Sequence, residues 1–262
     1  MRGITAGNKK PIMENTALQA LSPYLRSDLD PGFVSHDGGI FKYLNPAFIC
    51  GDNEKYMRLY NRLAPLYDFG ERWIGWLKYG NAVARLRTEL MRLLEWKNHA
   101  SVLYVSIGTG KDLGYLPKNI APKSLKLVGA DISAGMLRRA QNVWSRKLDL
   151  SLVNCAAEDL PFIDNCFDIV FHVGGINFFT DKRQAIAEML RVAKPQTLLM
   201  IADETQDFIE KQYQKNALTK KAYQDVHFEL SEITNAIPAG VTDLETRFLW
   251  DKRFYAITFR KP

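Results

Sequence analysis

From residue 100 onward, short apolar runs alternate with segments whose apolar residues recur at helical spacing. This alternation is typical of an α/β protein in which crossover helices join the strands of a parallel sheet. Two further β-rich runs near the end of the chain predict an antiparallel hairpin through Asp251-Lys252. The predicted strands are 101–107, 126–131, 151–156, 167–173 and 197–203, the hairpin is 243–250 with 253–260, and the helices begin near Asp112, Ala134, Lys182 and Asp207.

The first 99 residues show a different pattern. Turn-forming residues are frequent in residues 1–50, so this N-terminal extension is not expected to form a core alone. We expect it to drape over the main domain or to reach another subunit of a homo-oligomer. Residues 51–99 look helical with breaks near Pro65 and Gly80, which predicts a helical lid or cap. Residues 100–262 are then the α/β domain.

Composition narrows the class of protein. No apolar run approaches the roughly 18 residues that span a bilayer, so no membrane span is expected. The three cysteines lack Cys-x-x-Cys spacing, which indicates reduced thiols in the cytoplasm and no metal site. The net charge of +6 would suit nucleic acid, but the basic residues fall on helical patterns that are typical of solvated faces. Nucleic acid is therefore not the expected partner.

The most informative motif is a glycine turn between a buried strand and a predicted helix. The turn is Gly108-Thr109-Gly110, and Asp131 ends the next strand 21 residues after Gly110. This spacing is close to that between a phosphate-binding turn and a ribose-binding acid. A dinucleotide fingerprint would need a third glycine where Leu113 stands, and no P-loop Gly-Lys-Ser/Thr is present. The pattern indicates a nucleoside site and points to S-adenosylmethionine as the cofactor.

Further motifs follow in order: Asp131–Leu137, Asn154–Phe162, Cys166–Val173 and Asp181–Pro195. Together with the glycine turn they resemble the class I S-adenosylmethionine-dependent methyltransferases, especially the type 11, ubiquinone/menaquinone-biosynthesis-like group. The resemblance covers about residues 55–205. It implies a Rossmann-like sheet, mostly parallel with a C-terminal antiparallel hairpin, and an N-terminal helical cap.

The resemblance also implies roles for particular residues. It puts Ser106, Gly108, Thr109 and Gly110 at the methionine end of the cofactor, Asp131 on the ribose, Ile132 and Met136 against the adenine, Ala157 and Glu158 at the adenine edge, His172 near the sulfonium, and Tyr60 and Tyr67 in a segment that closes over the cofactor. His172 and Tyr67 are the catalytic candidates. His172 has an equally good interpretation as a strand histidine, and Tyr67 has one as a core aromatic.

Several positions depart from the family pattern. Tyr104 stands where the family usually has Asp or Glu, Ser106 where it often has Gly, and Ala156 where it often has Asp or Asn. Gln196 replaces a glycine in a distant turn. Each lost hydrogen bond costs roughly 0.5–1.5 kcal/mol, so weaker cofactor binding is expected rather than none.

The leading hypothesis is methyl transfer to carbon or oxygen of a small, fairly apolar acceptor, such as a natural product or a quinone-like ring. A second hypothesis, motivated by Tyr104 and Ala156, is a protein that binds S-adenosylmethionine without transferring methyl. Such a protein would promote a rearrangement or cyclisation, or act as a binding module. A third hypothesis, motivated by the isoelectric point near 9.1, is that the protein methylates RNA.

Overall fold

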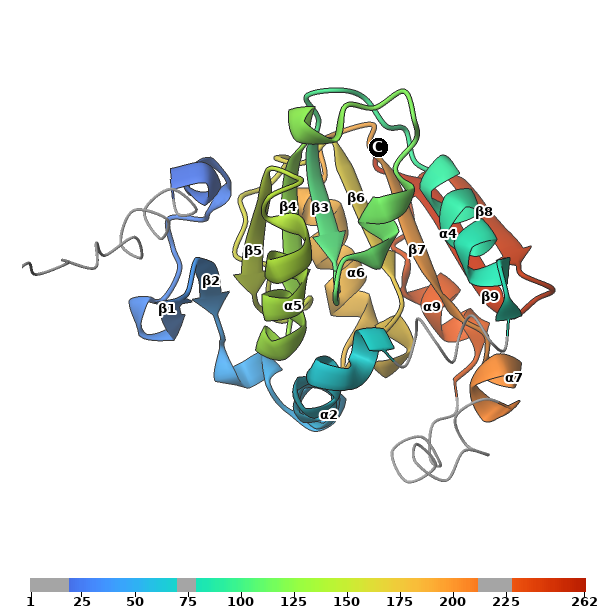
Figure 1. Ribbon diagram of the computed structural model, residues 1–262, viewed down its shortest axis with the longest axis horizontal. Helices are drawn as coiled ribbons and strands as arrows, with labels where there is room; N and C mark the ends of the chain where they lie inside the picture. The colour runs from blue at the N-terminus through green and yellow to red at the C-terminus, as the bar shows by residue number, and fades with distance from the viewer. Residues whose placement is uncertain (1–18, 70–78, 212–227) are drawn as a thin grey trace, which may run out of the picture.

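The structure is a computed structural model, and it describes residues 19–69, 79–211 and 228–262, without the side chains of 66–69 (Figure 1). In these residues the strands form a nine-stranded sheet in the order β1-β2-β5-β4-β3-β6-β7-β9-β8. The strands are β1 (Val34–Asp37), β2 (Ile40–Tyr43), β3 (Ser101–Val105), β4 (Lys126–Asp131), β5 (Leu150–Asn154), β6 (Ile169–Val173), β7 (Leu198–Glu204), β8 (Thr242–Leu249) and β9 (Phe254–Arg260).

The sheet has the predicted topology. β2, β5, β4, β3, β6 and β7 run parallel, and β9 and β8 follow as an antiparallel hairpin on the far side of β7. The carboxyl ends of the parallel strands therefore lie along one edge, where α/β proteins bind their ligands. The prediction of a mostly parallel sheet with a C-terminal antiparallel hairpin is confirmed.

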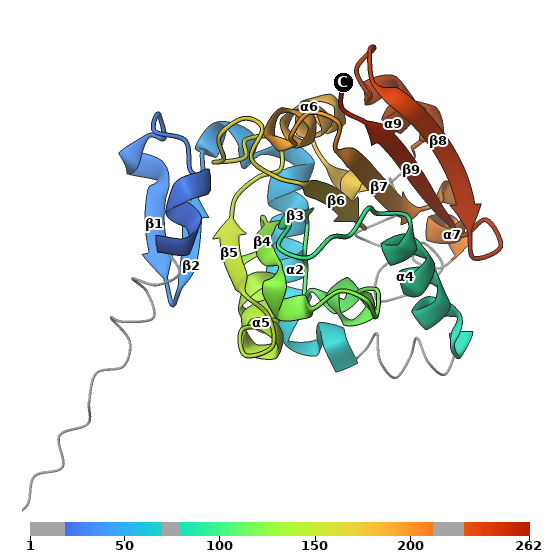
Figure 2. The ribbon, with the colours of Figure 1, turned by 90° about the horizontal axis from the view of Figure 1, so that it is seen from above.

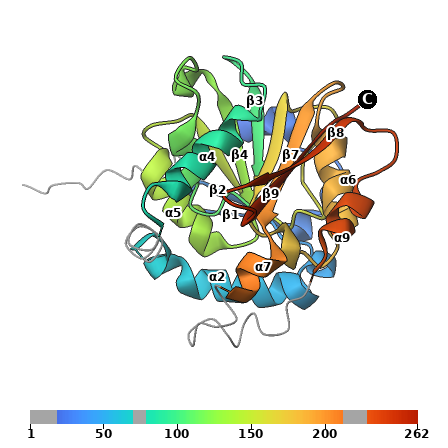
Figure 3. The same cartoon turned by 90° about the vertical axis from the view of Figure 1, so that its right-hand side faces the viewer.

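Helices cover both faces of the sheet (Figure 2). α4 (Ala82–Arg92) and α5 (Ala134–Trp144) supply buried residues to one core cluster, and α6 (Lys182–Val192) and α9 (Leu230–Ala236) supply them to the other. A further helix, α2 (Gly51–Phe69), lies across the carboxyl-end edge of the sheet (Figure 3). Helices at Ala134 and Lys182 were expected. Of the helix predicted from Asp207, α7 (Gln206–Ile209) is described, and residues 212–227 lie outside the described residues.

One predicted helix is short. A five-residue 3₁₀ turn, η5 (Lys111–Tyr115), follows the glycine turn in place of an α-helix. Gly114 disfavours continuation, and Pro117 biases Leu116 toward extended backbone, where it has φ −53° and ψ 142°. The helix predicted to begin near Asp112 is therefore present only as this short 3₁₀ segment.

The described part of the N-terminal extension joins the sheet. β1 and β2 form a hairpin, and β2 pairs in parallel with β5. Before the hairpin, Tyr24 stacks on Phe167 with ring centroids 5.2 Å apart, and Arg26 donates to Asp159 at 2.8 Å. The described part of the extension thus packs on the main domain, which was one of the two expectations. A subunit contact through this extension stays a prediction, as do the domain divisions at residues 50 and 99.

Candidate cofactor site

The structure brings the glycine turn and Asp131 together. β3 and β4 are parallel neighbours, so the turn after Val105 and the end of β4 lie side by side. The backbone N–H of Gly108 donates to Asp131 Oδ2 at 2.8 Å, and the N–H of Ile107 donates to the Ala130 carbonyl at 3.1 Å. The two motifs that were singled out in the sequence therefore share one site at the carboxyl ends of adjacent strands.

The Asp131 carboxylate is held from two sides. Its Oδ1 accepts from the Ser133 N–H at 2.8 Å, in addition to the Gly108 bond to Oδ2. Asn154 on β5 fixes the backbone that follows, because its Nδ2 donates to the carbonyls of Asp131 and Ile132, each at 2.9 Å. Burial raises the pKa of Asp131 to about 6. Each carboxylate oxygen retains a lone pair that can accept from a hydroxyl.

The two glycines of the turn have different tasks. Both adopt left-handed backbone, with φ 54° at Gly108 and 74° at Gly110. A Cβ at Gly110 would lie 2.8 Å from Trp144 Nε1, which itself donates to the Thr109 carbonyl at 3.0 Å. A Cβ at Gly108 would have no atom within 4 Å. Gly110 is thus needed for packing on α5, while Gly108 faces open space beside the Asp131 carboxylate.

Tyr104 and Ser106 show how the chain accommodates its departures from the family pattern. Tyr104 is buried, stacks on Phe171 with centroids 4.2 Å apart, and donates to Asp112 Oδ2 at 2.5 Å. Arg87 on α4 donates to the other oxygen of Asp112 at 2.6 Å. Tyr104 is therefore part of the core under α4 and α5. Ser106 has φ 55°, a conformation that costs a non-glycine residue roughly 1–2 kcal/mol.

The predicted adenine contacts lie around the start of α5 and the loop after β5. Ile132 is half-buried and Met136 is buried in the first turn of α5, where its N–H donates to the capping hydroxyl of Ser133 at 3.2 Å. Ala157 is half-buried. Their proximity to Asp131 suits an adenosine, and their contact with the adenine stays a prediction.

Glu158 has partners within the protein. It is buried, and its Oε1 accepts from Asn53 Nδ2 at 2.8 Å and from the Asp181 N–H at 3.3 Å. Burial raises the pKa of this carboxyl. Because Asn53 also exchanges backbone and side-chain hydrogen bonds with Thr180, Glu158 ties the start of α2 to the loop before α6. Its place at the adenine edge stays a prediction.

His172 is a buried side chain with spare hydrogen-bonding capacity. It lies on β6, is fully buried, and neither ring nitrogen has a hydrogen-bond partner in the described part of the chain. Its ring meets Phe179 edge-on with centroids 5.4 Å apart. Burial lowers the pKa of His172 to about 3, so the imidazole is neutral at physiological pH. Unsatisfied buried nitrogens of this kind suit a ligand or water partner.

The Gly174-Gly175 loop after β6 is held firmly. Buried Asp203 on β7 accepts from the backbone N–H groups of Gly175 at 2.9 Å and Asn177 at 3.1 Å. Tyr255 on β9 donates to Asn177 Oδ1 at 2.8 Å. Burial raises the pKa of Asp203 to about 6. The loop is thus fixed by side chains from two strands.

α2 is fastened to the site through Asn61, a residue that the sequence analysis did not single out. Asn61 Oδ1 accepts from the Ser133 hydroxyl at 2.8 Å and from the Gly135 N–H at 2.9 Å. A Cβ at Gly135 would lie 3.1 Å from Ala64 Cβ, so the helices are in close contact. Tyr60 is half-buried and packs against the core, whereas the Tyr67 side chain lies outside the described residues.

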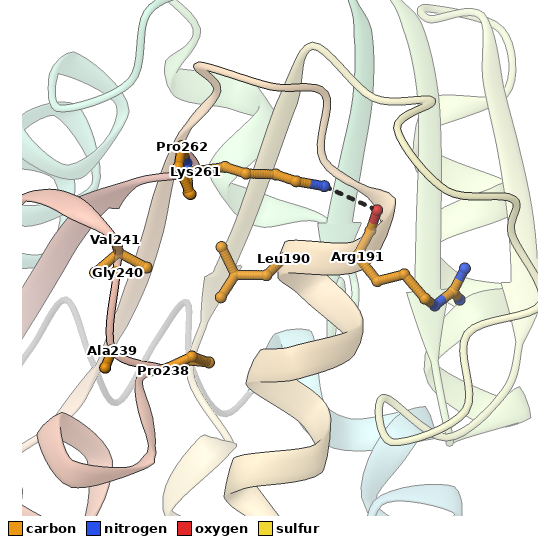
Figure 4. A pocket seen from close by; sticks show the side chains of 8 residues that line it. All are labelled: Leu190, Arg191, Pro238, Ala239, Gly240, Val241, Lys261 and Pro262. Carbon is orange, nitrogen blue, oxygen red and sulfur yellow. Dashed lines mark hydrogen bonds between the residues drawn. The ribbon is translucent and has the colours of Figure 1, made fainter.

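Other features of the described residues lie apart from this site. A pocket of about 280 Å³ is lined by Leu190, Val241 and Lys261 among others (Figure 4). Lys261 follows Arg260, which pairs with the first residue of β7, so the pocket lies at the edge of the sheet opposite the glycine turn. No group of three or more His, Cys, Asp or Glu side chains suited to a metal ion occurs in the described ranges. No described helix is both long and apolar enough to cross a bilayer.

A mostly parallel sheet that ends in an antiparallel hairpin, with a glycine turn and an acid on adjoining strands, defines the class I methyltransferase fold. Residues 103–201 match the family described as the methyltransferase domain. This part of the chain is therefore similar to the methyltransferase domain of class I, S-adenosylmethionine-dependent enzymes.

Relatives and solved structures agree with this class. The chain is 32% identical over 147 residues to the ubiquinone/menaquinone biosynthesis C-methyltransferase UbiE of Geobacter sulfurreducens, covering 54% of this chain and 55% of that one. It is 33% identical over 154 residues to the demethylmenaquinone methyltransferase of Thermotoga maritima, covering 58% and 63%. The chain thus spans little more than half the length of these relatives.

Two solved structures have the same fold. A S-adenosylmethionine-dependent methyltransferase from Aquifex aeolicus superposes with a TM-score of 0.52 at 19% identity, over 67% of this chain and 89% of that one. The [4+2]-cyclase SpnF superposes with a TM-score of 0.55 at 17% identity, over 70% and 82%.

Proposed function

We propose that this protein transfers the methyl group of S-adenosylmethionine to a carbon or oxygen atom of a small, fairly apolar, quinone-like acceptor. The observation that carries the proposal is the Asp131 carboxylate bonded to Gly108 N–H, beside open space at the carboxyl ends of β3 and β4. The printed names of two relatives, a ubiquinone/menaquinone biosynthesis C-methyltransferase and a demethylmenaquinone methyltransferase, support a quinone-like acceptor.

The residues fit the cofactor. Asp131 would accept from the ribose hydroxyls, and Gly108 leaves room for the backbone to approach the methionine end. When bound, the cofactor supplies an already activated methyl group, so the protein's task is to align the acceptor. Burial lowers the pKa of His172 to about 3, which disfavours its use as a general base, and its place near the sulfonium stays a prediction. Tyr67 remains a candidate for the lid over the site.

The ribose assignment is tested by calorimetric titration of S-adenosylmethionine into two aspartate variants. Asp131→Ala removes two charge-assisted acceptors, and we expect roughly hundredfold weaker binding. Asp164→Ala is the matched control, because Asp164 is exposed and its pair with Arg191 contributes little. Asp131→Asn, which keeps the side-chain shape, guards against a folding defect and is also expected to bind weakly. Equal affinity of all variants would remove the assignment.

A second function is favoured by one observation. Tyr104 stands where the family resemblance implies an acid, and its hydroxyl donates to Asp112 inside the core. The alternative is therefore a domain that binds S-adenosylmethionine and promotes a rearrangement or cyclisation, a use compatible with the fold of SpnF. Formation of S-adenosylhomocysteine with a panel of quinols separates the two. Turnover supports methyl transfer, whereas tight cofactor binding without turnover on any acceptor supports the alternative.

A further inference from the structure

β8, at the C-terminal edge of the sheet, is unusually exposed. Every residue from Thr242 to Phe248 is exposed, so neither face of the strand is covered by a described helix. Two of these residues are large and apolar, since Leu244 and Phe248 are each 52% exposed. β8 pairs with β9 on one side, and no described segment pairs with its other edge. Edge strands of this length are usually shielded, because their free N–H and C=O groups attract another strand.

The sequence of β8 is complementary to itself. In an antiparallel arrangement centred on Thr246, Leu244 faces Phe248 of the partner subunit, and Glu245 faces Arg247 of the partner subunit. Two-fold symmetry repeats both pairs, so the contact contains two apolar and two opposite-charge pairs. Directly opposed pairs of these kinds stabilise antiparallel strands.

The charged side chains of Glu245 and Arg247 already lie on one face of β8, as this pairing requires. Arg247 donates to both carboxylate oxygens of Glu245, at 2.6 and 2.7 Å, so the two side chains lie together on one face of the strand. Pairing with a second copy would surround each charge with opposite charges. The regular part of β8 begins after the irregularity between Thr242 and Glu245, which leaves the stretch centred on Thr246 free to pair.

The opposite edge of the sheet lacks this property. β1 consists of Val34, Ser35, His36 and Asp37. The same antiparallel arrangement about its centre would set an apolar valine against an acid. Asp37 is also bonded to Lys42 and Arg138 within the chain. The complementarity is therefore particular to β8.

We propose that a second copy of this chain docks on β8 and continues the sheet across a two-fold axis. The test is sedimentation velocity of the full chain over a range of concentrations. We expect the wild type to form a dimer of twice 29.9 kDa. Glu245→Arg and Arg247→Glu each turn both opposite-charge pairs into like-charge pairs, and we expect the dissociation constant to rise at least about tenfold.

The decisive arm mixes the two variants. In a mixed dimer the introduced arginine of one subunit faces the introduced glutamate of the other, so an equimolar mixture is expected to regain dimerisation. Asp28→Arg is the control for Glu245→Arg, because it makes the same change in net charge on a side chain that is 75% exposed near the other end of the sheet. Circular dichroism checks that each variant is folded. A wild-type monomer at every concentration, a dimer insensitive to charge reversal, or failure of the mixture to recover would each overturn the proposal.

Discussion

At the residue scale, Asp131 has two demands placed on it. It accepts from the Gly108 and Ser133 N–H groups, which shapes the turn, and under the proposed function it would also accept from the ribose. Burial raises its pKa from 3.8 to about 6, so the folded protein holds this proton more tightly than the unfolded chain does. The contribution of Asp131 to stability therefore falls as pH rises from about 4 to 6 and is constant above. Under the proposed function, a bound cofactor would offset this loss of stability by donating hydrogen bonds to the ionised carboxylate.

This titration predicts the pH dependence of cofactor binding. Because the ionised carboxylate is the better acceptor, we expect the affinity for S-adenosylmethionine to be constant above pH 6 and to fall below it. Calorimetry between pH 5 and 8 would measure the profile, with Asp131→Asn as the comparison. The variant lacks the Asp131 titration, so its profile should be flatter. Any contribution from Asp203, whose pKa burial also raises to about 6, is the same in both proteins. Parallel profiles would show that another group controls binding.

The sequence alone was sufficient to predict those site residues that lie within a local motif. Gly108, Gly110 and Asp131 lie in motifs with a fixed spacing, and the structure puts them together. Asn154 and Trp144 were missed as supporting residues, because their roles depend on strand register and on which face of α5 meets the turn. The partner of Tyr104 was missed for the same reason.

At the element scale, the glycine turn is followed by η5 and not by a long helix, so the site depends on other elements for its rigidity. α5 holds the turn from behind through Trp144, and α2 holds the start of α5 through Asn61. Helical periodicity was sufficient to predict that α2 exists. It gave no information on where α2 lies, because that is decided by the contact of Gly135 with Ala64 and by the polar contacts of Asn53 and Asn61.

Asn61 is expected to govern how long the cofactor stays bound. Asn61→Ala leaves the Gly135 N–H and the Ser133 hydroxyl without their α2 acceptor, which loosens α2 over the site. We expect S-adenosylmethionine to dissociate about tenfold faster, from the loss of one to two hydrogen bonds. Stopped-flow displacement measures this rate. Asn235→Ala on α9 is the matched control, because Asn235 is exposed and accepts from Arg183 through its backbone carbonyl, which the substitution keeps. An unchanged rate in Asn61→Ala would contradict a lid role for α2.

At the scale of the whole molecule, the largest difference from expectation is the N-terminal extension. Its turn residues gave no strand signal, because β1 and β2 are four residues each and too short for a clear alternation. The pairing of β2 with β5 is a long-range contact that a local pattern cannot show. The buried residues Leu21, Phe41 and Tyr43 belong to the same core cluster as β3 to β7. The extension is therefore expected to fold together with the domain.

Phe41 tests this cooperativity. Phe41→Ala removes a side chain that is 4% exposed in the shared core, and we expect a loss of about 3–5 kcal/mol in the free energy of unfolding. Because β2 pairs with β5 within the sheet, urea unfolding followed by tryptophan fluorescence and by circular dichroism should show one coincident transition at lower denaturant. Ser35→Ala, at an exposed position of β1, should leave the midpoint unchanged. An early separate transition in Phe41→Ala, with the main midpoint unmoved, would show that the extension is an independent unit attached to a domain that is stable without it.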